Sequence, residues 1–200
     1  MGCVVAGANK EEAVAGVPDA LGEWLRFLAS VGEEVPSPDQ ELEISVDEWV
    51  RSDAAVGQGE SDAFFDADDE PLAEKDIELG LQRLGGLRGL LLPHIRRRPE
   101  DEIAPARQVL DELARAQWWT LSRLGASPLA EVPDKVVGRL DTAMALTVQR
   151  FGELEPDQRA RRLELDGELW TPRKVMRRLL WLESSLGRTA RVLLNARDGR

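Results

Sequence analysis

From Pro71 to the C-terminus, apolar residues recur every three or four positions, the spacing that places them on one face of an α-helix. The last such series runs through Leu179, Leu182 and Leu186 and follows Thr171, an N-cap residue with a proline directly after it. The whole pattern predicts four helices, over residues 72–92, 103–124, 133–152 and 171–195. Four amphipathic helices joined by short links predict an antiparallel four-helix bundle.

Two local features refine this prediction. The helix over residues 72–92 carries four glycines, each of which weakens a helix by about 1 kcal/mol relative to alanine. We therefore expect either close contact with another helix or a break near Gly85–Gly86. Before the last helix, "RLELDGELW" places Asp166–Gly167 between alternating residues, which is typical of a tight β-hairpin.

Residues 1–50 show a different pattern. "GCVVAG" is predicted as a short strand, and Asn9 has the position of a helix N-cap, with Glu12 three residues later as in a capping box. Pro18 predicts a kink or a restart of this helix. "ELEISVDEWV" then alternates between apolar and polar residues, as a half-buried strand does. The predicted order is strand, helix, strand, and because two strands bury little surface, their exposed edge is expected to pair with another chain as a homo-oligomer or to lean on the bundle.

This first segment resembles the HicB-like module, a small sheet backed by a helix. The residues that carry the resemblance are Gly2–Cys3, Gly7, Glu11–Glu12–Ala13 and the run to Leu25. The family normally has a strand before this point, whereas this chain begins at Met1. We interpret residues 1–50 as a HicB-like α/β module whose first strand is missing.

Residues 51–70, "RSDAAVGQGESDAFFDADDE", are acidic and rich in glycine and alanine. This composition predicts a linker between the N-terminal module and a bundle domain over residues 71–200. The aromatic pair Phe64–Phe65 is unusual in such a segment, and we expect it to dock on the protein's own surface.

Charge is unevenly distributed and limits the classes of partner. Residues 1–70 contain 3 basic and 18 acidic side chains, a net charge of −15, whereas residues 71–200 contain 23 and 19, a net charge of +4. The acidic part repels nucleic acid and anionic lipid, so neither is predicted as a partner, while a basic protein is. No run reaches the ~18 apolar residues of a membrane span. With one cysteine and no export signal, the sequence predicts a cytoplasmic protein.

The four predicted helices resemble the DinB-like family. The likeness lies in "VLDELARAQWWTLSRLG" and in "DGELWTPRKVMRRLLWLESSLGRTA". Family members typically hold a divalent metal with three histidines, one in the second helix and an H-x-x-x-H pair in the fourth. The best-known activity that this resemblance implies is metal-dependent transfer to low-molecular-weight thiols.

Carried over to this sequence, the ligand positions fall on Glu112, Leu182 and Leu186. Leucine has no donor atom, and one carboxylate does not hold a divalent ion without further ligands. The sole histidine, His94, is expected in a loop beyond the first bundle helix and matches none of these positions. We therefore predict no metal and no other cofactor. The candidate residues for a surviving ligand pocket are Glu112, Trp119 and Trp181.

The predicted fold class is therefore α+β and mainly α. Three functional hypotheses follow from it. The first is a non-catalytic, metal-free DinB-like protein of bacterial type that binds a partner protein or a small ligand. The second is an enzyme of the DinB-like thiol-transferase kind with a site rebuilt around Glu112, and the third is a stress or toxin–antitoxin-type regulator that acts through its acidic HicB-like module.

Overall fold

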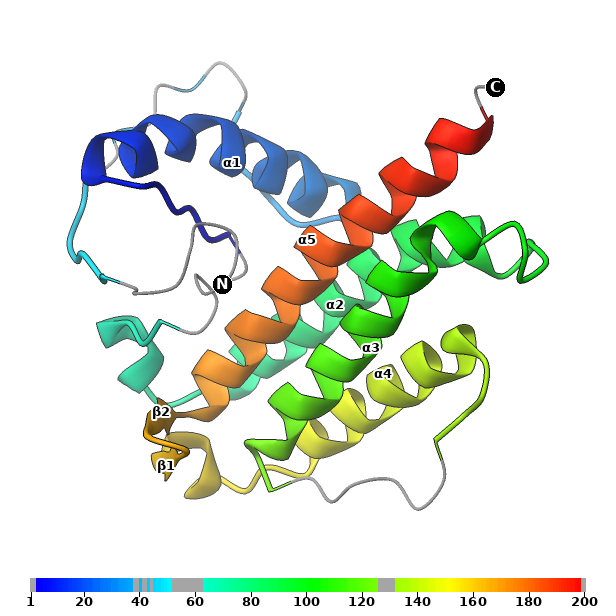
Figure 1. Ribbon diagram of the computed structural model, residues 1–200. Helices are drawn as coiled ribbons and strands as arrows, with labels where there is room; N and C mark the ends of the chain where they lie inside the picture. The colour runs from blue at the N-terminus through cyan, green and yellow to red at the C-terminus, as the bar shows by residue number, and fades with distance from the viewer. Residues whose placement is uncertain are drawn as a thin grey trace.

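The computed structural model describes residues 3–37, 40, 43, 45–51, 63–125 and 132–198 (Figure 1). These residues form five α-helices, two short 3₁₀ helices and one two-stranded antiparallel sheet. Mainly helical structure with a small sheet agrees with the predicted class. The elements are α1 (Lys10–Ser30), η1 (Asp66–Asp69), α2 (Glu74–Ile95), α3 (Ala104–Ser122), α4 (Val136–Gly152), η2 (Gln158–Ala160), β1 (Leu163–Leu165), β2 (Glu168–Trp170) and α5 (Pro172–Asp198).

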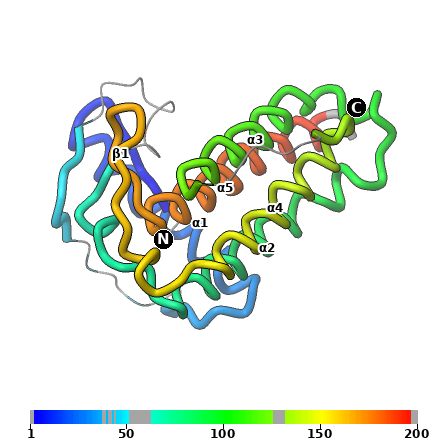
Figure 2. The backbone as a smooth tube through the Cα atoms, turned by 90° about the horizontal axis from the view of Figure 1, so that it is seen from below, coloured from blue at the N-terminus to red at the C-terminus, as the bar shows by residue number. Residues whose placement is uncertain are grey.

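Helices α2 to α5 pack together, with α5 against both α2 and α3 and with α4 against α3 (Figure 2). Gly80 of α2 lies against Met176 near the start of α5, and Arg88 pairs with Glu183 further along both helices. Helices α2 and α5 therefore run in the same direction. In the described residues, no helix is long and apolar enough to cross a membrane.

The helix directions differ from an antiparallel bundle joined by short links. Arg139, near the start of α4, pairs with Asp111 of α3, and Figure 1 shows that α3 and α4 also run in the same direction. The connection over residues 123–135 can extend about 40 Å. That reach exceeds the length of α3, about 28 Å. A link of this length does not force neighbouring helices to be antiparallel.

Helix α1 begins as the sequence predicts and continues through its proline. The Asn9 side chain accepts a hydrogen bond from the Glu12 backbone N–H at 2.9 Å, and the Glu12 side chain accepts one from the Ala8 backbone N–H at 3.0 Å. Pro18 lies inside the helix and does not end it. The second half of α1 is held by packing, because Phe27 and Leu28 are buried in the core shared with α2 and α5.

The two predicted N-terminal strands are not found in the described residues. Residues 3–9 and 45–50 carry no strand, and Glu41, Leu42 and Ile44 lie outside the described part. Two isolated strands on one helix bury too little apolar surface to be stable. Val4 and Val46 instead line an open groove beside α1. The sheet edge that was expected to mediate self-association is therefore not formed by these residues.

The glycines of α2 allow close contact, and the helix does not break. A side chain at Gly80 would meet Met176 of α5, and one at Gly86 would meet Val31 and Phe27 at the end of α1. Helix α2 continues through residues 85–86 to Ile95. The predicted loop position of the histidine was therefore wrong, because His94 lies in the last turn of this helix.

Polar contacts also attach the end of α1 to α2. Arg83 donates hydrogen bonds of 2.7 and 2.5 Å to the Glu33 carboxylate, and Gln82 donates one of 3.2 Å to the Val31 carbonyl. The hydrogen bond from Arg83 lowers the pKa of the Glu33 carboxyl below its ordinary value. The N-terminal helix is thus joined to the bundle by both apolar and polar contacts.

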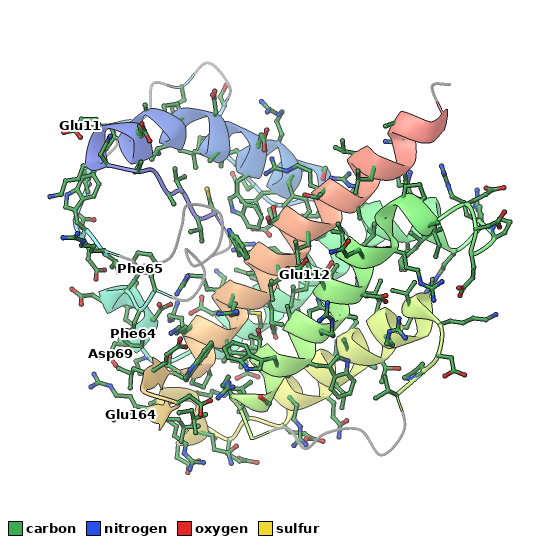
Figure 3. The ribbon with its side chains drawn as sticks, viewed as in Figure 1. Glu11, Phe64, Phe65, Asp69, Glu112 and Glu164 are labelled. Carbon is green, nitrogen blue, oxygen red and sulfur yellow. The ribbon has the colours of Figure 1, made fainter. Side chains whose placement is uncertain are left out.

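The segment before α2 docks on α5, as expected from its aromatic pair (Figure 3). Phe64 and Phe65 are half-buried, and the Arg177 guanidinium lies 4.7 Å from the Phe65 ring centre. Arg177 also donates hydrogen bonds of 2.9 and 2.7 Å to the buried Asp68 carboxylate. This buried ion pair fixes the end of the acidic segment at the start of α5.

The predicted hairpin and the start of the last helix are confirmed. Strands β1 and β2 pair antiparallel around Asp166 and Gly167, whose φ angles of 57° and 80° suit a tight two-residue turn. Directly after β2, the Thr171 hydroxyl accepts a hydrogen bond of 3.1 Å from the Lys174 backbone N–H, as an N-cap does. The hairpin therefore leads without a gap into α5.

Candidate functional site

The three positions that correspond to the family's metal ligands have different surroundings. Leu182 is buried in a core cluster with Leu110 and Leu113, and Leu186 packs against this cluster. Glu112 is exposed on α3 and makes no hydrogen bond or ion pair with the residues that the structure describes (Figure 3). The two leucines thus belong to the packed interior, and the carboxylate faces solvent.

The two candidate tryptophans also lie apart. Trp119 follows Glu112 by seven residues, or about two helical turns, and packs edge-on against Trp170 with ring centres 5.3 Å apart. Trp181 instead lines a cavity of about 330 Å³ between α1, α2 and α5, together with Trp24. The structure therefore does not bring Glu112, Trp119 and Trp181 into one pocket.

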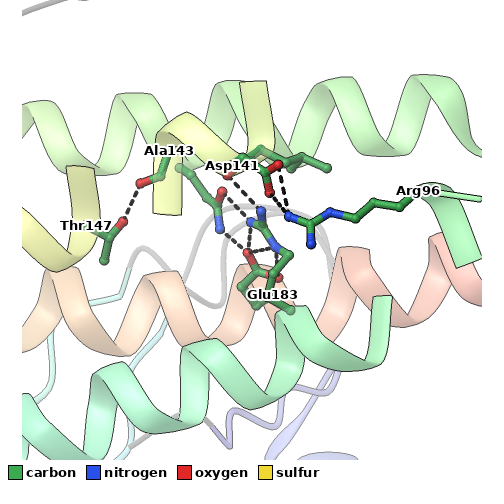
Figure 4. Close-up of polar contacts among 8 residues, drawn as sticks. Arg96, Asp141, Ala143, Thr147 and Glu183 are labelled. Atoms are coloured by element: carbon green, nitrogen blue, oxygen red, sulfur yellow. Dashed lines mark hydrogen bonds and ion pairs between the residues drawn. The ribbon is translucent and has the colours of Figure 1, made fainter. Parts of the chain in front are cut away.

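A buried ionic network occupies the centre of the bundle (Figure 4). The Arg88 guanidinium on α2 pairs with the Glu183 carboxylate on α5 and donates hydrogen bonds to Gln117 Oε1 on α3 at 3.0 Å and to the Leu140 carbonyl on α4 at 2.8 Å. Gln117 also donates to Glu183. Arg88, Gln117 and Glu183 are each at most 3% exposed. One arginine thus contacts all three neighbouring helices of the bundle.

The sequence contains a signal for this network, although no motif marks it and the sequence-based prediction missed it. Arg88 lies four residues after Leu84 and three before Leu91, which is a position on the apolar face of α2. Gln117 and Glu183 likewise lie four residues after an interior leucine, Leu113 and Leu179 respectively. Charged residues are seldom fully buried without a partner. An arginine, a glutamine and a glutamate at interior positions of three different helices therefore indicate one shared network.

A group of aromatic and cationic side chains lies at the end of the bundle where α5 begins. The Arg178 and Arg123 guanidinium groups lie 4.6 and 4.2 Å from the centre of the Trp119 ring. The Lys174 ammonium lies 4.2 Å from the centre of the buried Trp170 ring. Burial lowers the pKa of the Lys174 ammonium, and it lowers the pKa of Arg178 to about 10, so Arg178 remains charged near neutral pH.

Next to this group is a pocket of about 230 Å³, which we call the end pocket. It lies between the C-terminal ends of α3 and α4, the segment through η2, and the hairpin that precedes α5. The residues that define it are Arg123, Arg150, Gln158, Arg161, Leu163 and Trp170.

Two arginines of the end pocket are accessible and weakly paired. Arg161 is exposed and makes no ion pair within the described part of the chain. The Arg150 side chain is 34% exposed and approaches Glu153 only to 4.0 Å. The Trp170 indole Nε1 and the Nε atoms of Arg123 and Arg150 also have no hydrogen-bond partner among the described residues, but these three atoms are buried. The donors that a ligand could reach in the end pocket are therefore those of the exposed parts of Arg150 and Arg161.

Comparison of the sequence with models of known protein families and with curated proteins, and of the fold with solved structures, finds no significant match. Within the described ranges, no group of three or more histidine, cysteine, aspartate or glutamate side chains is arranged to hold a metal ion.

The network at the bundle centre and the end pocket differ in the chemical groups that they offer to a ligand. At the bundle centre, the Arg88 guanidinium, the Glu183 carboxylate and the Gln117 amide are bonded to one another. The end pocket instead combines the accessible side chains of Arg150 and Arg161 with an apolar wall that includes Leu163. It is therefore the better candidate for ligand binding.

Proposed function

We propose that this protein is a non-catalytic, metal-free binding protein with a DinB-like helical arrangement, and that it binds a small ligand in its end pocket. The observation that carries the proposal is the contrast between the two sites. The centre of the bundle is filled by leucines and by the network of Arg88, Gln117 and Glu183, whereas the end pocket has space and two accessible arginines, Arg150 and Arg161.

Enzymatic chemistry around Glu112 has less support. A rebuilt thiol-transferase site needs further metal ligands or a base beside this carboxylate, but Glu112 is exposed and forms no polar contact with the described residues. The end pocket is lined by one carboxylate, Glu153, which is exposed and accepts a hydrogen bond of 2.8 Å from Gln149. These residues suit binding better than proton transfer.

Regulation through the acidic N-terminal part would require that segment to be available to a basic partner. Its end is already engaged, because Asp68 is buried and bound by Arg177, and Glu70 lies within 3.9 Å of the Arg173 guanidinium. The basic groups that meet this acidic segment belong to the same chain. Internal neutralisation accounts for part of the charge contrast without an external partner.

Thermal denaturation in the presence of a small-molecule panel tests the proposal. A ligand present at 100 times its Kd stabilises by about 2.7 kcal/mol. For a chain of this size, that corresponds to a rise in Tm of about 5–10 °C. The variant Leu163→Trp fills the end pocket and should lose the response, whereas Leu90→Trp, at an exposed position on α2, should retain it.

Elemental analysis of the untagged protein provides a second test of the proposed function. A stoichiometric divalent ion that remains after dialysis would contradict the metal-free proposal. A ligand response that Leu163→Trp leaves unchanged would move the binding site away from the end pocket.

A further inference from the structure

We propose that the ligand of the end pocket is a small organic anion, a carboxylate or a phosphate ester, held by Arg150 and Arg161. This inference rests on the proposed binding function and adds the chemical class of the ligand. Two independent features of the pocket support it: its charge, with two accessible arginines, and its apolar wall.

The charge of the lining favours an anion. Three arginines line the end pocket, against one carboxylate from Glu153. Arg123 is paired with Asp166 at 2.6 Å, but that carboxylate is 78% exposed on the hairpin turn and lies outside the lining. Arg161 has no carboxylate partner among the described residues. Arginine binds carboxylate and phosphate through paired, charge-assisted hydrogen bonds, so this lining suits an oxyanion better than a neutral or cationic group.

Two of the lining arginines are accessible to a ligand. The Arg150 side chain is 34% exposed and Arg161 is exposed, whereas Trp170 is 1% exposed and its Nε1 is buried. A guanidinium group only donates hydrogen bonds, and the oxygens of a carboxylate or phosphate only accept them. The ligand head group is therefore expected beside Arg150 and Arg161.

The apolar wall and the size of the pocket define the rest of the ligand. Leu124, Leu154 and Leu163 line the pocket together with Pro172. Its volume of about 230 Å³ equals that of seven or eight water molecules. This space fits a small ring or a short aliphatic chain attached to the charged head group. We therefore expect aromatic anions to bind more tightly than anions that lack an apolar part.

A titration followed by ¹H–¹⁵N NMR at constant ionic strength tests the inference with defined probes. The six tryptophans each contribute an indole N–H resonance, and the variant Trp170→Phe identifies that of Trp170. Benzoate or phenyl phosphate should shift the Trp170 resonance with saturation, and about tenfold higher concentrations of acetate or inorganic phosphate should be needed, because these two anions bury no ring against the apolar wall. The benzoate and phenyl phosphate arms distinguish a carboxylate from a phosphate ligand.

Charge-neutral variants locate the site. Arg150→Gln and Arg161→Gln should each weaken binding by about tenfold or more, since each removes a charge-assisted hydrogen bond. Arg107→Gln is the matched control: it removes the same charge from an exposed arginine on α3 that is paired with Glu100 at 3.0 Å, and it should leave the affinity unchanged. Because Arg161 is exposed, its variant should fold even if Arg150→Gln does not.

Two outcomes would overturn the inference. One is the lack of a saturable shift of the Trp170 resonance with any of the four anions. The other is an equal loss of affinity in Arg107→Gln, which would show general attraction of anions to the surface. If a neutral ligand were then found that stabilises the wild type but not Leu163→Trp, the proposed binding function would stand without the anionic ligand class.

Discussion

Removing Arg88 provides the sharpest test of the packed bundle centre. In the variant Arg88→Met, the Glu183 carboxylate stays at a position that is 2% exposed and keeps, among the described residues, only the Gln117 amide as a donor. The Leu140 carbonyl also loses its bond from Arg88. Methionine fits the length of the arginine stem, so the change removes the charge and the donors while it keeps most of the apolar contact.

The expected loss of stability is large. Leaving one partner of a buried ion pair without the other costs about 3–5 kcal/mol. Domains of ordinary stability have about 5–15 kcal/mol in total. The triple variant Arg88→Met/Gln117→Leu/Glu183→Leu removes every side chain of the network and leaves no buried charge unpaired. It should therefore be less destabilised than Arg88→Met alone.

Urea unfolding, followed by tryptophan fluorescence and circular dichroism, measures the free energy of unfolding of both variants. We expect the midpoint urea concentration to fall and the slope m to stay constant. Arg96→Met is the matched control, because Arg96 ends the same helix and pairs with Asp141 while both side chains are about half exposed (Figure 4). An exposed pair of this kind contributes about 0–1 kcal/mol. A loss below about 1 kcal/mol in Arg88→Met, or a triple variant less stable than it, would refute the reasoning.

Three further predictions follow from particular contacts. Leu182→His should cost about 2–5 kcal/mol, because it places a polar ring in the core, and zinc titration should show no tight binding; a well-folded variant that binds zinc tightly would contradict this. Gly86→Ala should destabilise the protein by about 1–3 kcal/mol through its clash with the end of α1, whereas Gly85→Ala, which meets open space, should stabilise it by about 0.5–1 kcal/mol in thermal unfolding. Glu33 has a lowered pKa in the folded state, so its stabilising contribution is present above its ordinary pKa and is lost as the pH falls through the folded value. The difference in unfolding free energy between the wild type and Arg83→Gln should therefore narrow from pH 6 to pH 3. A constant difference would show that the Arg83–Glu33 pair does not cause this pH dependence.

The end pocket could not be predicted from the sequence. Trp119, one of the predicted pocket residues, packs against Trp170 but is not among the residues that line the end pocket. The residues that line the pocket come from separate parts of the chain. Arg123 directly follows α3, Arg150 lies near the end of α4, and Trp170 ends β2. No spacing in the sequence relates these three positions, because only the packing of the helices brings them together.

The sequence by itself determined the features that depend on neighbouring residues. The helical periodicity, the cap at Asn9, the turn at Asp166–Gly167 and the start of α5 at Thr171 all arise from interactions within a few residues. Only the tertiary structure decided the direction of α4, the absence of strands in residues 3–9 and the burial of Arg88 between three helices. These depend on which surfaces meet, since a buried charge or an isolated strand is stable or unstable only through partners that lie far away in the chain.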